Sequence, residues 1–167
     1  SQLDIAMICP LHGPVHKENL KPLLSAYGKW ASYNPEDKDG IMIAYSSVYG
    51  GTANVAMVLA SKLVERGMRN VVVYDVSKTD SSYLIAEAWR VGTILLVATT
   101  YNAGVFIKME EFLHDLANHQ LRNRNVGFIE NGSWAPAAKA NMKRILEKLD
   151  ERLPRKILAA LPMIYLN

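Results

Sequence analysis

Residues 41–52 read IMIAYSSVYGGT, an apolar run followed by a turn that contains two serines, two glycines and a threonine. The apolar run is typical of a strand that is buried on both faces of a sheet. Residues 54–64 then carry apolar side chains at roughly the helical period, so a helix is expected to begin close to the glycines. Strand, glycine turn and helix in this order predict one unit of a parallel α/β sheet.

The turn between this strand and helix has the composition of an anion site. A helix N-terminus offers unpaired N–H groups and partial positive charge, and Gly50 and Gly51 lack the Cβ atoms that keep a backbone away from a ligand. Ser47 and Thr52 add hydroxyl donors. The alternative is that the glycines only form a tight turn. The nucleotide loop G-x-x-x-x-G-K-[ST] and the dinucleotide fingerprint G-x-G-x-x-G are both absent, which favours a terminal phosphate held by neutral donors.

The same alternation of strand and helix continues along the chain. Further apolar runs occur at residues 71–74, 94–98 and 126–129, and a fifth strand is expected at 156–166. Helical patterns cover residues 19–33, 54–66, 82–90, 105–119 and 137–152. Parallel strands need crossover helices, so the pattern predicts a doubly wound α/β fold.

Composition excludes several classes of protein. The 167 residues carry a net charge of +3, and their basic side chains alternate with acids, as in residues 143–156, so no nucleic-acid partner is expected. Cys9 is the only cysteine, which excludes an internal disulfide and predicts a reducing, cytoplasmic location. No apolar stretch reaches the roughly 18 residues of a membrane span. The absence of an initiating Met leads us to expect an excised piece of a longer protein.

Three loops are expected to meet at the carboxyl edge of the sheet, where open α/β sheets bind ligands. They read SSVYGGT at residues 46–52, TTYNAG at 99–104 and ENGSWAP at 130–136. Tyr101 and Trp134 offer aromatic faces to a flat conjugated ring. Together with the phosphate loop, they indicate flavin mononucleotide (FMN). The alternatives are that Tyr101 packs its own loop and that Trp134 fixes the start of the following helix.

These loops, in this order, resemble those of the flavodoxin superfamily, and the whole chain resembles the C-terminal part of the flavodiiron proteins, or A-type flavoproteins. CPLHGPVHK at residues 9–17 is similar to the segment that links the diiron domain of that family to its flavodoxin-like domain. The resemblance implies a flavodoxin-like five-stranded parallel sheet in the order 2-1-3-4-5 with helices on both faces. It also implies a linker and helix at residues 1–40 and an FMN-binding domain at residues 41–167.

The resemblance also implies which residues bind the cofactor. FMN is expected to contact Ser47, Val48, Tyr49, Gly50, Gly51, Thr52, Thr99, Thr100, Tyr101, Asn102, Ala103, Gly104, Asn131, Gly132, Ser133 and Trp134. His12 corresponds to the last protein ligand of the diiron site, but the H-x-E-x-D-H motif of that site is absent from this chain. One histidine cannot build a two-iron centre, so we expect His12 to face solvent without the diiron domain.

In that family, electrons enter at FMN from a redox partner such as rubredoxin or a reductase. Within a homodimer they then reach the diiron site of the neighbouring subunit, where dioxygen is reduced to water or nitric oxide to nitrous oxide. The chain by itself is therefore expected to be an electron-transfer domain with no catalytic side chain. Three alternatives stay open: a free-standing flavodoxin-like electron carrier, an NAD(P)H-dependent flavin reductase, and a non-redox interaction domain of the same fold.

Overall fold

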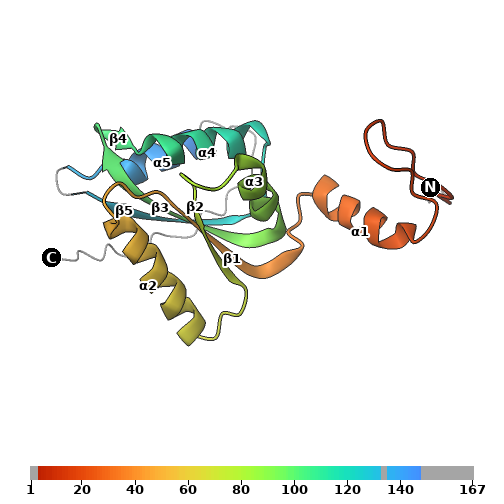
Figure 1. The fold of residues 1–167 in the computed structure, drawn as a ribbon, viewed down its shortest axis with the longest axis horizontal. Coiled ribbons are helices and arrows are strands. Elements are labelled where there is room, and N and C mark those ends of the chain that lie inside the picture. The colour runs from red at the N-terminus through yellow and green to blue at the C-terminus, as the bar shows by residue number, and fades with distance from the viewer. Residues whose placement is uncertain (1–3, 133–134, 148–167) are drawn as a thin grey trace.

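Four parallel strands form the centre of the fold in this computed structural model, which describes residues 4–132 and 135–147 (Figure 1). β1 (Asp37–Tyr45) lies between β2 (Val71–Asp75) and β3 (Val91–Tyr101), and β5 (Asn125–Asn131) pairs with the other side of β3. The order β2-β1-β3-β5 confirms the order that was predicted for the first four strands, and with it the doubly wound α/β class.

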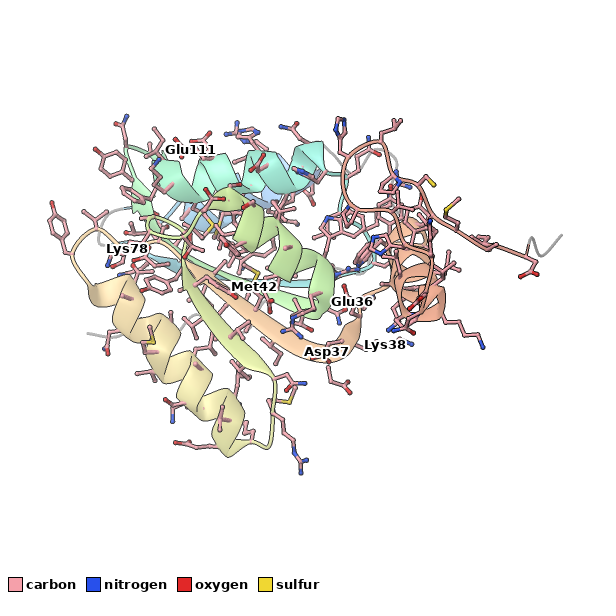
Figure 2. The ribbon with its side chains drawn as sticks, turned by 45° about the vertical axis from the view of Figure 1, so that its right-hand side comes forward. Glu36, Asp37, Lys38, Met42, Lys78 and Glu111 are labelled. Atoms are coloured by element: carbon pink, nitrogen blue, oxygen red, sulfur yellow. The ribbon has the colours of Figure 1, made fainter. Side chains whose placement is uncertain are left out.

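The ends of the sheet differ from the sequence prediction. β4 (Gly104–Val105) is a two-residue strand that pairs antiparallel with the end of β3, and the strand predicted at residues 156–166 lies outside the described residues. β1 begins at Asp37, inside a stretch that reads as a polar connector. The carboxylate of Asp37 accepts hydrogen bonds from Asn70 Nδ2 at 2.8 Å and from the N–H of Gly40 at 2.9 Å. These bonds hold polar residues at the start of the strand, where Figure 2 labels Asp37 and Lys38.

Helices cover both faces of the sheet, as predicted. α2 (Gly51–Glu65) packs on one face, whereas α3 (Ser81–Arg90), α4 (Ile107–Asn118) and α5 (Ala138–Glu147) cover the other (Figure 1). Because side chains alternate along a strand, β1 sends Ile41 and Ile43 to the core beneath α2 and Met42 to the larger core beneath the other three helices. None of the described helices is long and apolar enough to cross a membrane.

The N-terminal part of the chain forms an arm beside the sheet. It consists of a short leader, closed by an antiparallel bridge between Ile8 and His16, and of α1 (Leu20–Ala31). Figure 1 shows this arm and β4 at opposite ends of the molecule. No residue of α1 is fully buried. In the described part of the leader, every residue except Ile8 and His16 is exposed, so the leader is a turning segment outside the α/β core, as its prolines and glycine predict.

The end of α1 is attached to the core by four side chains, which we call the arm latch: Tyr33, Trp89, Arg122 and Arg124. The buried guanidinium of Arg124 donates to the carbonyls of Tyr33 at 2.7 Å and of Ala88 at 3.1 Å, and also to that of Trp89. Burial lowers the pKa of Arg124 to about 10. The Tyr33 ring lies 5.3 Å from the Trp89 ring and 4.8 Å from the Arg122 guanidinium. The latch thus joins α1 to the end of α3 and the start of β5.

Candidate functional site

The loop between β1 and α2 leaves the first turn of α2 open. Gly50 is the N-cap of α2 with a φ of 89°, a left-handed conformation that favours glycine, and a Cβ placed there would meet nothing within 4 Å. Its N–H donates to Ser47 Oγ at 3.0 Å, which holds the turn. No side chain caps α2, and its first turn has no acidic residue. The geometry therefore leaves backbone donors and open space for an anion.

Two other helices of the fold have their first turns occupied. Asp80 caps α3 by accepting from the N–H of Ser82 at 2.9 Å, and the hydrogen bonds from Ser82 lower the pKa of that carboxyl. At α5, the N–H groups of Ala137 and Ala138 donate to Thr100 Oγ1 at 2.9 and 3.1 Å. The N–H of Lys139 donates to Glu130 Oε2 at 3.0 Å. α1 and α4 also lack a side-chain cap, so α2 is distinguished by its glycine N-cap rather than by the missing cap alone.

A buried hydroxyl at the base of the loop was missed by the sequence analysis. Ser46 is fully buried, and although its N–H donates to the Val97 carbonyl at 3.0 Å, its Oγ has no hydrogen-bond partner in the part of the chain that the structure describes. A buried hydroxyl left unpaired costs about 1–3 kcal/mol. Its position next to Ser47 makes Ser46 a further candidate for a site that is completed by a ligand. The only sequence signal was its place in SSVYGGT.

The second loop is a tight hairpin between β3 and β4. Asn102 and Ala103 connect the paired residues Tyr101 and Gly104, and both have positive φ, 48° and 58°. A two-residue hairpin of this kind needs left-handed backbone at both central positions. The Tyr101 ring packs edge-on against Phe106 with centroids 5.6 Å apart, yet 53% of the residue is exposed. Tyr101 therefore packs its own loop and still presents surface for stacking.

The third loop contacts both of the others. Asn131 Nδ2 donates to Thr52 Oγ1 at 3.3 Å, so this amide lies against the first loop. A Cβ on Gly132 would lie 3.0 Å from Thr100 Oγ1, so this close approach favours glycine. Asn141 of α5, the helix that follows the third loop, donates from Nδ2 to the Ala103 carbonyl of the second loop at 3.4 Å. The described residues of the three predicted loops thus meet at one edge of the sheet.

Other predicted site residues are exposed or lie outside the described residues. Tyr49 is 99% exposed and Val48 is 39% exposed, so both project from the first loop. Ser133 and Trp134 lie outside the described residues. His12 is exposed in the leader, and Figure 1 shows the N-terminal arm that contains the leader at the other end of the molecule from β4. Among the described residues, no group of three or more His, Cys, Asp or Glu side chains is arranged to hold a metal ion.

A groove of about 800 Å³ lies between residues 76–81 and α4. Carboxylates lie at its rim, and two of them have hydrogen-bond or ion-pair partners. Asp115 accepts a hydrogen bond from Ser81, and Glu111 Oε2 lies 2.8 Å from Lys108 Nζ. Figure 2 shows Glu111 and Lys78 toward the same end of the molecule. Glu110, Glu111 and Asp115 line the groove, and these carboxylates repel an anion, so it is a weaker candidate for an anion site than the α2 turn.

The family profile described as "Flavodoxin domain" matches residues 42–161, which is most of the chain. The chain therefore belongs to the flavodoxin domain family.

Among individual relatives, it is 29% identical to an uncharacterised protein of Methanocaldococcus jannaschii, over 88% of this chain and 37% of that protein. It is 24% identical to the anaerobic nitric oxide reductase flavorubredoxin of Escherichia coli O1:K1 / APEC, over 81% of this chain and 28% of that protein. The structure of rubredoxin oxygen:oxidoreductase from Desulfovibrio gigas shares the fold with a TM-score of 0.74 and 19% identity, over 95% of this chain and 39% of that one. The chain thus spans well under half the length of these relatives.

Proposed function

We propose that this chain is an FMN-binding electron-transfer domain. The observation that carries the proposal is the glycine turn before α2, whose first-turn donors are free of a side-chain cap. When bound, FMN supplies the electron-carrying chemistry. The family match supports the same function, since the flavodoxin domain family covers the loops that form this edge of the sheet.

The first loop has the groups that a phosphate requires. The N–H groups at the start of α2 and the hydroxyl of Thr52 are neutral donors, and the partial positive charge of the helix favours an anion there. Ser47 Oγ accepts from Gly50, so its own proton stays available for donation. These residues would hold the phosphate end of the flavin without a lysine or arginine.

The second and third loops would surround the flavin ring. The exposed surface of Tyr101 is available for stacking, and Phe106 limits the movement of its ring. Carbonyls at residues 102–104 would accept a hydrogen bond from a ring nitrogen, and Trp134 is the proposed partner on the other side. None of these residues is needed as a general acid or base.

Within a longer protein, we propose that the domain passes electrons to a diiron domain that reduces dioxygen or nitric oxide. The names of its relatives support this, because they include a nitric oxide reductase flavorubredoxin and a rubredoxin oxygen:oxidoreductase. In that protein His12 would be a metal ligand, a rubredoxin-type protein or a reductase would donate electrons, and the functional unit would be a homodimer. The single, exposed Cys9 suits a reducing cytoplasm.

The first prediction concerns FMN retention. Purified protein mixed with excess FMN should keep flavin absorbance after desalting, and Gly50→Val should weaken FMN binding at least about tenfold, because a β-branched residue is strained at this φ and fills the anion space. Gly67→Val is the matched control. Gly67 lies at the other end of α2, has a φ of 88° and also has open space around a Cβ, so it bears the same strain away from the loop.

Wild-type protein that retains no flavin would contradict the proposal. Equal losses of FMN affinity in the two valine variants would show that strain in α2, rather than the anion site, explains the effect. Anaerobic mixing of the FMN-loaded protein with NADH and NADPH separates the alternatives. Reduction by nicotinamide alone would favour a flavin reductase, and its absence is expected for an electron-transfer domain.

A further inference from the structure

We infer that Asn131 is a positioning residue that orients the hydroxyl of Thr52 toward the phosphate, and that it thereby sets the preference of the site for FMN over riboflavin. This inference rests on the proposed function. The inference goes beyond that function because it assigns phosphate selectivity to Asn131. The resemblance of the sequence had placed this residue of the third loop beside the flavin ring.

The contact joins two distant parts of the chain. Asn131 Nδ2 donates to Thr52 Oγ1 at 3.3 Å across a separation of 79 residues. Thr52 is only 2% exposed and is the second residue of α2. A Cβ built on Gly51 would lie 3.5 Å from the same Asn131 nitrogen. The amide thus lies against the first two residues of the helix whose N-terminus is open.

Asn131 is held in place by the sheet. It is the last residue of β5, and it is in register with Thr99 of β3. Thr52 is likewise held by its position in the first turn of α2. Because each partner belongs to a regular element, the two side chains are held next to each other before any ligand binds. Preorganisation of this kind lowers the entropic cost of binding.

The direction of the hydrogen bond decides what Thr52 can do. A threonine hydroxyl has one proton to donate and two lone pairs to accept with. When Asn131 donates to one lone pair, the proton of Thr52 is directed elsewhere, and hydrogen bonds in series strengthen one another. Thr52 then acts as a donor beside the N–H groups of α2. A phosphate has charged acceptor oxygens, whereas riboflavin ends in a neutral hydroxyl, so donors favour FMN.

The second prediction tests this selectivity through two dissociation constants. Flavin fluorescence titrations with FMN and with riboflavin should show that Asn131→Ala raises the Kd for FMN by about 2- to 10-fold, while the Kd for riboflavin changes by less than about twofold. Asn131→Asp should raise the Kd for FMN further, because a carboxylate accepts the Thr52 proton and repels the phosphate.

Asn141→Ala is the matched control. The Asn141 amide donates to the backbone carbonyls of Ala103 and Ala137, on the ring side of the site, so its removal should not change the ratio of the two constants. If wild-type protein binds FMN and Asn131→Ala shifts both constants by one common factor, or neither, the inference is wrong. If wild-type protein binds no flavin, the proposed function itself fails.

Discussion

At the scale of single residues, Ala103 adopts a backbone conformation that alanine seldom takes. Its φ of 58° places it in the left-handed region, directly after Asn102 at 48°. Asparagine tolerates this region, but for alanine it costs about 1 kcal/mol. The hairpin between β3 and β4 requires it, since Tyr101 pairs with Gly104 and only two residues connect them. Strain of this kind often occurs where a loop is shaped for a ligand.

The third prediction follows from this conformation. Ala103→Val should lower the free energy of unfolding by about 1 kcal/mol or more, because a β-branched side chain is disfavoured at positive φ, whereas Ala103→Gly should leave it unchanged or raise it. Urea unfolding measures both variants. If valine proved as stable as glycine, the loop would not need a left-handed residue at this position.

At the scale of elements, the end of α1 shows how the arm is fixed. The N–H of Tyr33 donates to the Trp30 carbonyl at 3.0 Å and that of Asn34 to the Lys29 carbonyl at 2.9 Å, the pattern of a Schellman motif. α2 ends in the same motif with Gly67 at the left-handed position. In α1 that position is held by Tyr33, with a φ of 56°. The contacts of the arm latch offset the strain of placing a tyrosine there.

The fourth prediction concerns the arm latch. Arg124→Met should lower the free energy of unfolding by about 2–3 kcal/mol, because the carbonyls of Tyr33, Ala88 and Trp89 lose a charged donor. It should also speed amide exchange at residues 32–34 and widen the distribution of distances between spin labels on α1 and on the core. FMN affinity should not change, since Arg124 precedes β5, at the edge of the sheet opposite the loops.

Arg122→Met is the control for the latch. Its guanidinium stacks on Tyr33 but makes none of the bonds to α3, so a smaller loss of about 0.5–1 kcal/mol is expected. Unchanged amide exchange and unchanged label distances in Arg124→Met would show that the arm is fixed by other contacts.

At the scale of the whole molecule, β3 separates two unequal cores. Leu96 is fully buried in the core beneath α3, α4 and α5, whereas its neighbour Leu95 points to the α2 face and is only partly buried. The fifth prediction is that Leu96→Ala lowers the free energy of unfolding by about 2–5 kcal/mol and that Leu95→Ala lowers it by less. Denaturant unfolding compares the same chemical change on the two faces. Equal losses would show that the α2 face is packed as tightly as the other.

Much of this architecture could be predicted from local sequence. The apolar runs at residues 71–74, 94–98 and 126–129 lie within β2, β3 and β5, because continuous burial leaves a continuous apolar signal. β4 and the start of β1 could not be predicted in this way. β4 is a two-residue strand paired with its own hairpin, and Asp37 is held in β1 by polar partners from other elements.

The candidate site also has features that local sequence predicts and features that it does not. Gly50 could be recognised from sequence, since a glycine turn between a strand and a helix has a direct backbone consequence. By contrast, no sequence pattern indicates that the hydroxyl of Thr100 accepts from the N–H groups at the start of α5. Ser46 reads as one more serine of the loop, yet it is the one whose hydroxyl is buried.

The sequence by itself determined the succession of strands and helices, the two-sided sheet and the glycine turn, because these depend on the periodicity and the backbone freedom of neighbouring residues. Only the tertiary structure decided which polar side chains meet. The contact of Asn131 with Thr52 spans 79 residues, and that of Arg124 with Tyr33 spans 91. Such contacts depend on how the sheet brings distant strand ends together, and neighbouring residues carry no signal of that.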